Sequence, residues 1–134
     1  MPRPRGLIGV IVLELFVGIL GIATGSNLLA DPSGKGVGLD VVLPLLPFLS
    51  DFTLLGVWFC SIYGVLPILL GLGLWMGRRI AWMGALVLAG IEIVWLIVQI
   101  YWVGLDVWQG IIGGIAVATI LLLHRPSVKA YCGK

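Results

Sequence analysis

The chain has 134 residues, of which 60% are hydrophobic and 10% are charged, and its formal net charge is +2. Its mean hydropathy of +1.18 lies far outside the usual make-up of a soluble domain. These values exclude a disordered chain, a disulfide scaffold and a nucleic-acid-binding protein, and they predict an integral membrane protein.

The first apolar segment covers residues 7–29, which is long enough for a helix that crosses a bilayer. Arg3 and Arg5 precede it, as basic residues precede the apolar part of a signal peptide. Glu14 within the segment and the length of the segment argue against cleavage. We therefore expect a retained first helix.

A polar connection with glycines and prolines follows at residues 30–52. It contains an apolar stretch, residues 41–49, that is too short to span a membrane and is broken by Pro44 and Pro47. This stretch is expected to lie on or dip into the outer membrane interface. A lid packed over the helix ends is favoured over a re-entrant loop that forms a selectivity element.

Three further apolar segments cover residues 53–76, 80–103 and 107–124. The connections between them, at residues 77–79 and 104–106, are tight turns, and short turns imply antiparallel neighbours. The predicted fold is all-α: a polytopic membrane protein whose four transmembrane helices form one antiparallel bundle and a single domain.

Basic residues predict the direction of the spans, because cytoplasmic loops are enriched in Lys and Arg. Only Lys35 lies in the 30–52 connection, and seven basic residues lie on the other side of the predicted membrane. Both termini are therefore predicted to be cytoplasmic, in a multi-pass protein of the cell membrane. The seven are Arg3, Arg5, Arg78, Arg79, Arg125, Lys129 and Lys134.

Aromatic and basic residues near the helix ends are expected to hold the chain at the two membrane interfaces. Pro126 should stop the fourth helix where the lipid headgroups begin, so that the tail lies along the surface. A tail that docks a protein partner is the alternative. The predicted anchors at the inner interface are Trp75, Arg78, Arg79, Trp82, Arg125 and Lys129; Trp58, Tyr101, Trp102 and Trp108 are expected near the outer one.

Small residues recur on one face of each predicted helix, where they allow close packing within a membrane. Pro67 is also expected to kink the second helix, because proline removes a backbone donor. The four stripes are Gly18, Gly21 and Gly25 with Glu14; Gly56, Cys60, Gly64, Pro67 and Gly71; Ala81, Ala85 and Ala89 with Glu92; and Gly110, Gly114 and Ala118.

The sequence offers little for catalysis. Cys60 and Cys132 fall on opposite sides of the predicted membrane, and His124 is the sole histidine, so neither a disulfide nor a bis-His haem can form within one chain. No Ser-His-Asp set, glycine-rich phosphate loop or metal-binding spacing is present. We therefore predict no self-contained enzyme, no metal site and no cofactor.

Two acids, Glu14 and Glu92, lie within the apolar segments, about 12 and 18 Å from the inner ends at the helical rise per residue. They could meet near the middle of the membrane, and no Lys or Arg within a span neutralises them. A charge at mid-span costs about 2.5 to 3.5 kcal/mol on insertion scales, so at least one carboxyl should be protonated or hold a cation.

This acid pair has two interpretations. In one, Glu14 and Glu92 form a proton or cation site assisted by Gln99, with Gln109 or Tyr63 as further candidates. In the other, a neutral carboxyl forms a hydrogen bond to a neighbouring helix and adds packing specificity.

Three stretches resemble one family: "RPRGLIGVIVLELFVGILGIATG" at the start, "GLGLWMGRRIAWMGALVLAGIEI" in the centre and "HRPSVKAYCGK" at the end. They are similar to the uncharacterised small four-helix membrane proteins of archaea and bacteria, with an RPxG start, a GLWxGxxxAW centre and an RPxVKxYFG end. Cys132 stands where that pattern has Phe. The resemblance covers about half the chain and implies four spans with cytoplasmic ends, but no activity.

The short loops and glycine stripes favour a non-enzymatic accessory, assembly or structural component of the membrane. The alternative is a transporter or channel that handles protons or cations through Glu14 and Glu92. The expected partners are membrane lipids, together with further copies of the chain or a larger membrane complex.

Overall fold

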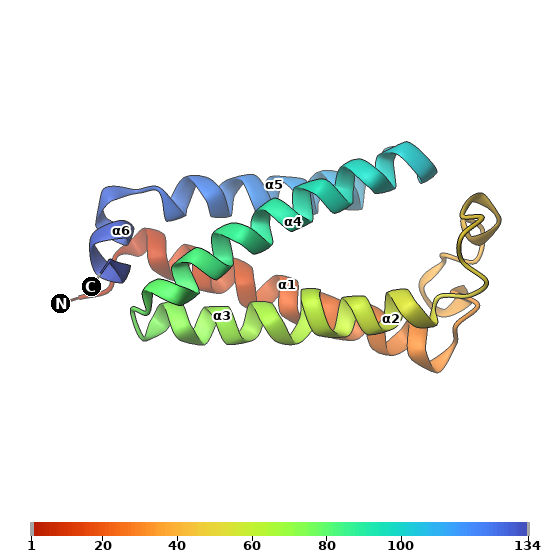
Figure 1. Cartoon of the computed structure of the whole chain (residues 1–134), viewed down its shortest axis with the longest axis horizontal. Coiled ribbons are helices and arrows are strands. Elements are labelled where there is room, and N and C mark those ends of the chain that lie inside the picture. The colour runs from red at the N-terminus through yellow and green to blue at the C-terminus, as the bar shows by residue number, and fades with distance from the viewer. Residues whose placement is uncertain (1, 134) are drawn as a thin grey trace.

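The computed structural model describes residues 2–133, and within them it contains helices and no strands (Figure 1). Lys134, counted above among the cytoplasmic basic residues, lies outside the described residues. The elements in chain order are α1 (Arg5–Ala30), the 3₁₀ turns η1 (Lys35–Val37) and η2 (Leu43–Leu45), α2 (Thr53–Cys60), the π-helical η3 (Ser61–Val65), α3 (Leu66–Trp75), α4 (Arg79–Val103), α5 (Val107–Leu123) and α6 (Pro126–Cys132).

Three helices are long and apolar enough to cross a membrane: α1, the continuous Thr53–Trp75 helix and α4. α5 has 17 residues, and it counts as a fourth candidate only together with α6, from which it is bent by 73°. The bend lies just before Pro126, which starts α6 and cannot continue the helix before it. The chain thus has several helices that are long and apolar enough to span a membrane, as its composition predicts.

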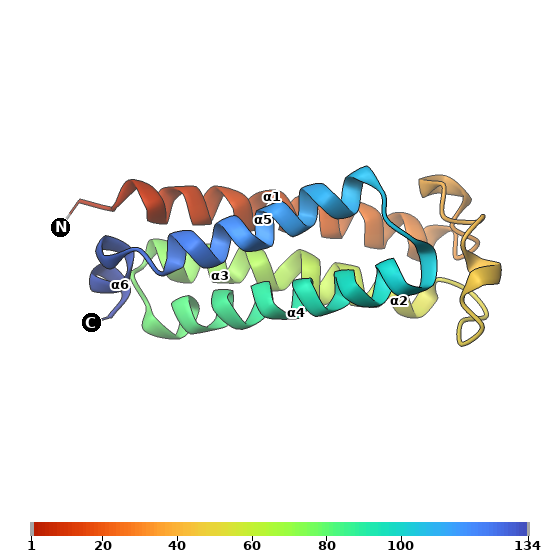
Figure 2. The same cartoon turned by 90° about the horizontal axis from the view of Figure 1, so that it is seen from above.

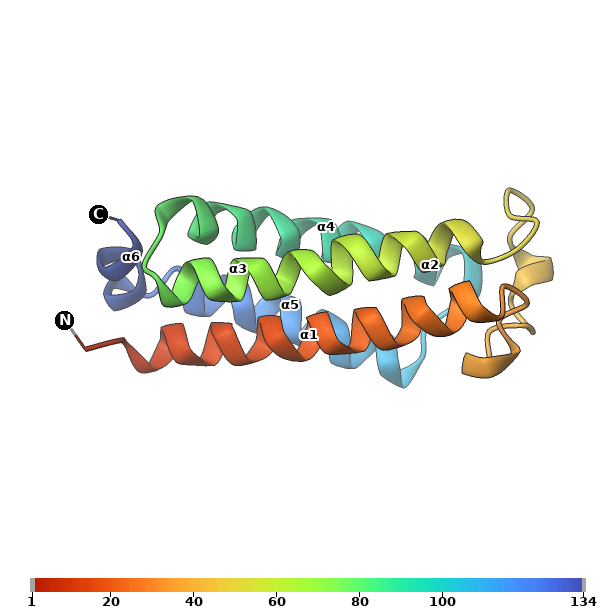
Figure 3. The same ribbon diagram turned by 90° about the horizontal axis from the view of Figure 1, so that it is seen from below.

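The long helices lie side by side along the long axis of the molecule (Figures 1, 2 and 3). α1 packs against α2, η3 and α3, while α4 packs against α3 and α5, and α5 also contacts α1. Both termini and α6 lie at one end of the molecule, and the 31–52 connection lies at the other. Chain reversals at Gly77 and Gly104 use positive φ angles of 70° and 91°, which favour glycine.

Glycines of α1 allow two backbones to touch. A Cβ atom at Gly21 would collide with the carbonyl of Tyr63, and one at Gly25 would lie 2.7 Å from the carbonyl oxygen of Gly56. A Cβ atom at Gly18 would lie 2.8 Å from the carbonyl oxygen of Gly64. The predicted stripe of α1 therefore packs directly against the α2–η3 segment, and any side chain there would force the two helices apart.

Pro67 is accommodated by a wide turn and not by a break in the helix. The N–H of Leu66 donates to the carbonyl of Ser61, five residues earlier, so that η3 is π-helical. Because Pro67 has no N–H, the carbonyl of Tyr63 loses its usual helical donor. Residues Thr53–Trp75 still form one candidate span.

The prediction of a small-residue packing face on the last long helix is wrong. Gly110 and Gly114 of α5 are exposed, and a Cβ atom on either would meet nothing within 4 Å. The buried face of α5 instead contains Gln109, Ala116, Thr119 and Leu123. α5 is apolar on all sides and has small residues on more than one face, so its sequence alone does not determine which face packs inward.

The 31–52 connection packs over the helix ends, which agrees with the lid interpretation (Figure 1). Leu46 and Phe52 are buried against Leu28 of α1, and Val103 at the end of α4 packs on the same cluster. Asp31 accepts hydrogen bonds from the backbone N–H and the hydroxyl of Ser33. These two bonds hold the pKa of Asp31 below its usual range, so the turn after α1 keeps an ionised carboxylate at neutral pH.

Candidate functional site

Glu14 of α1 and Glu92 of α4 both lie in the interior, each with only 5% of its surface exposed. Each carboxyl shares a helix face with small residues, because Gly18 and Gly21 follow Glu14 at helical spacing and Ala85 and Ala89 precede Glu92. Packing of these small-residue faces against neighbouring helices brings the acids inward. The residue pattern therefore accounts for the burial of both carboxyl groups.

The carboxyl group of Glu14 lacks a partner for one of its oxygens. Its Oε2 atom is fully buried and has no hydrogen-bond partner among the described residues. Glu92 lies close enough to interact electrostatically with both Glu14 and Tyr63. The two buried acids thus interact electrostatically with each other. A buried carboxylate normally requires hydrogen bonds or a cation to stabilise its charge.

Four aromatic side chains form a cluster next to the acids. Trp58 of α2 lies 5.9 Å from Tyr63 of η3 and 5.9 Å from Trp95 of α4, measured between ring centroids. Phe59 contacts the same two rings, at 5.8 Å from Tyr63 and 6.3 Å from Trp95. These rings join α2 and η3 to α4 across the interior.

Three polar atoms of this cluster are also buried without a partner in the described part of the chain. They are the hydroxyl oxygen of Tyr63 and the indole nitrogens of Trp58 and Trp95. Buried polar groups in native proteins nearly always have a partner, so several orphans in one region call for an explanation such as a ligand or water. With Glu14 Oε2, four buried polar atoms of the described residues lack a geometric hydrogen-bond partner.

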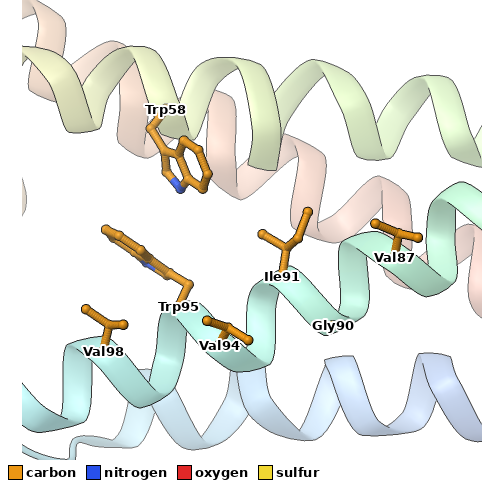
Figure 4. A pocket seen from close by; sticks show the side chains of 7 residues that line it. All are labelled: Trp58, Val87, Gly90, Ile91, Val94, Trp95 and Val98. Carbon is orange, nitrogen blue, oxygen red and sulfur yellow. The ribbon is translucent and has the colours of Figure 1, made fainter.

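An open groove of about 500 Å³ leads from the outside to this cluster. Figure 4 shows Trp58 and Trp95 projecting from facing helices at one end of the groove, with Val87, Gly90, Ile91, Val94 and Val98 along α4. Apart from the two indole nitrogens, its side chains are hydrocarbon. The groove therefore offers an apolar approach to a polar interior.

The three residues expected to assist the acids lie in different parts of the structure. Tyr63 lies beside Glu92. Gln99 is half-buried and follows Glu92 by seven residues on α4. Gln109 lies at the start of α5, where its side-chain oxygen accepts a hydrogen bond from the backbone N–H of Asp106 at 3.1 Å in a capping box.

Sequence reasoning missed the aromatic cluster. The sequence pattern predicts that Trp58 lies near the outer interface, and it indicates no role for Trp95. Two signals were available in the sequence. Three rings lie close together at positions 58, 59 and 63, and Trp95 follows Glu92 by three residues on one helix. Their contact across helices required knowledge of how α2 faces α4.

The predicted inner-interface anchors gather at the end of the molecule that holds both termini. Arg3 stacks on Trp75 at 3.7 Å, and its Nε donates to the carbonyl of Trp75 at 3.1 Å. The indole N–H of Trp82 donates to the carbonyl of Leu123 at 2.8 Å. Arg79, Trp82, Lys129, Cys132 and Gly133 line a second hollow of about 380 Å³, and Arg78 and Arg125 are exposed.

Within residues 2–133 no three His, Cys, Asp or Glu side chains are grouped so that they could hold a metal ion. No protein family, curated protein or solved structure matches the chain. The chemistry of the site therefore has to be argued from the acid pair, the aromatic cluster and the groove.

Proposed function

We propose that the chain is a multi-pass protein of the cell membrane with four antiparallel spans, the last of which is α5, and that α6 lies along the inner membrane surface. Both termini are then cytoplasmic, in agreement with the position of Arg3, Arg79 and Lys129 at the end of the molecule that holds the termini. Membership of the small four-helix family is proposed on the three sequence motifs alone.

This topology predicts which surface positions an impermeant maleimide reaches in intact cells. In a Cys60→Ala/Cys132→Ala background, Val41→Cys should be labelled, because Val41 is exposed in the 31–52 connection. Ser127→Cys, exposed in α6, should react only after the membrane is permeabilised. Labelling of Ser127→Cys in intact cells would contradict cytoplasmic termini.

We further propose that this non-enzymatic protein handles protons or monovalent cations at Glu14 and Glu92. The observation that carries the proposal is the buried Glu14 oxygen without a partner, in the field of a second buried acid. A carboxyl that only joins two helices would form a hydrogen bond to the neighbouring helix. An unpaired intramembrane acid instead favours a group that takes up and releases a proton or a cation.

A hydrophobic carbodiimide tests this proposal, because it reaches carboxyl groups in an apolar setting and reacts with the protonated form. Glu14 or Glu92 should acquire the adduct, as measured by mass spectrometry of the reconstituted protein. Asp51 and Asp106 are exposed and serve as internal controls that should stay unmodified. Labelling should fall as the pH is raised, since exchange converts the reactive form into carboxylate. Labelling that is absent, or that does not change with pH, would point to a carboxyl with a purely structural role.

A second candidate function is an accessory or structural subunit of a membrane complex. It is favoured by the exposed Gly110 and Gly114 of α5, since small residues in a membrane permit close contact with another helix. Native mass spectrometry from membrane patches would reveal such a subunit as a stable complex with a different chain, and a lone chain would exclude it.

A further inference from the structure

The second hollow, the α4–α6 hollow, has a volume of about 380 Å³ and is lined by Arg79, Trp82, Lys129, Cys132 and Gly133. The first two residues belong to the first turn of α4, and the other three belong to α6 and the residue that follows it. α6 is bent by 73° from α5 and lies at the end of the molecule where α4 begins (Figures 1 and 2). The bend therefore creates a hollow between two elements that are far apart in the sequence.

Both walls of this hollow are held in place by contacts with the rest of the molecule. The indole N–H of Trp82 donates to the carbonyl of Leu123 at 2.8 Å, which joins the first turn of α4 to the end of α5. Cys132 is buried in the apolar cluster that joins α6 to α1 and α4. The hydroxyl of Tyr131 donates to the carbonyl of Trp75 at 3.4 Å. A ligand would thus enter a site that is already formed.

The positive charge of the hollow has no acidic side chain near it among residues 2–133. Arg79 and Lys129 bring two cations to the hollow from different elements, and the first turn of α4 contains no acidic residue. The acidic residues of the chain lie in the interior or at the opposite end of the molecule, so the hollow attracts anions (Figure 2). They are Glu14 and Glu92 in the interior, and Asp31, Asp40, Asp51 and Asp106 at the opposite end.

These features fit the phosphate group of an anionic phospholipid. A guanidinium group forms paired hydrogen bonds with phosphate oxygens, and an ammonium group binds phosphate as a point charge. Directly beside Arg79, Ile80 and Met83 of α4 are 76% and 52% exposed, so hydrocarbon surface begins next to the charged groups. Acyl chains would cover this surface, whereas a soluble phosphate would not. The neighbouring hydrocarbon therefore favours a lipid over a free phosphate ester.

We infer that the α4–α6 hollow binds one anionic phospholipid of the inner leaflet, whose phosphate group contacts Arg79 and Lys129 and whose acyl chains lie along the exposed face of α4. The inference rests on the proposed topology and does not depend on the acid pair. It differs from general anchoring by basic residues, because a site requires the two cations that line the hollow and general attraction requires only the total charge.

Native mass spectrometry of the full chain tests this inference, with dioleoylphosphatidylglycerol in nonionic micelles as the probe. We expect one bound lipid per chain. Dioleoylphosphatidylcholine, whose choline cation cancels the phosphate charge, should bind about fivefold or more weakly. Arg79→Gln should weaken phosphatidylglycerol binding about tenfold, the loss expected for one charge-assisted hydrogen bond, and Lys129→Gln should act in the same direction.

Arg5→Gln is the matched control for Arg79→Gln. Both arginines are exposed and are the first residues of long helices, and both substitutions remove one positive charge. Arg5 does not line the hollow, so its replacement should leave binding unchanged. Equal weakening by the two variants would overturn the inference and indicate general attraction to a basic surface.

A second measurement uses the wild-type chain and needs no variant. Phosphatidylglycerol with a photoreactive diazirine on its headgroup should label peptides from the start of α4 and from α6, and labelling elsewhere would overturn the inference. Glycerol phosphate that displaces the lipid at equal concentration would overturn it too, since the site would then take a soluble phosphate ester. A chain with the proposed maleimide pattern that binds both lipids equally would overturn the inference and leave the topology intact.

Discussion

Gly21→Ala is expected to lower the free energy of unfolding of the helical domain by roughly 1–3 kcal/mol, the usual cost of forcing extra volume into a packed core. The added methyl group would collide with the carbonyl of Tyr63, which is backbone and cannot turn aside. α1 and η3 must then separate, and the packing of Gly18 and Gly25 on the same segment would weaken as well. Denaturation by SDS in mixed micelles, followed by far-UV circular dichroism, measures the change.

Gly114→Ala provides the matched control, since it makes the same chemical change on a helix of the same molecule. Gly114 has open space where the methyl group would lie, and alanine favours helix over glycine. Its free energy of unfolding should be unchanged or higher by about 0.5–1 kcal/mol. Equal destabilisation by the two variants would show that α1 does not depend on backbone contact for its packing.

Glu14→Gln is expected to reduce the dissipation of a pH gradient by reconstituted protein about tenfold or more, because an amide can neither release a proton nor balance a cation. The substitution keeps the size of the side chain and its place against Gly71. Proteoliposomes that enclose a pH-sensitive dye, with a potassium ionophore present to remove the membrane potential, report the rate. Glu92→Gln should have an effect of similar direction, since the two acids interact.

The control for this prediction is Gly114→Ala, which touches neither acid and should dissipate the gradient at the wild-type rate. Circular dichroism of each reconstituted variant separates lost activity from lost fold. A Glu14→Gln/Glu92→Gln chain that is folded and as active as wild type would rule out the acid pair as the exchanging site.

The positions of the long helices could be predicted closely from the sequence. The apolar segment at residues 80–103 corresponds to α4 at Arg79–Val103, and the segment at residues 7–29 corresponds to α1 at Arg5–Ala30. Hydropathy determines these segments because a chain in lipid must satisfy its backbone hydrogen bonds within apolar helices. Turn chemistry determines where they end, as Gly77 and Gly104 show.

Part of the candidate site was also readable from residue spacing. Glu14 and Glu92 occur on the faces that contain Gly18, Gly21, Ala85 and Ala89, and those faces are buried. The same reasoning failed for α5, where Gly113 and not Gly114 approaches a neighbour, the side chain of Leu96. Two adjacent glycines lie on different faces of a helix. Because α5 is apolar all round, its sequence does not indicate which of the two faces a neighbouring helix.

The sequence by itself therefore determined the apolar helices, the turns between them and the presence of two acids without basic partners, because these depend on hydropathy and local backbone chemistry. Only the tertiary structure decided that α5 presents Thr119 inward and that Trp58 meets Trp95 across a groove beside Glu92. The physical reason is that lipid is as apolar as the helix surfaces, so the rotation of each helix follows from the fit of its side chains to neighbouring helices, which no single segment encodes.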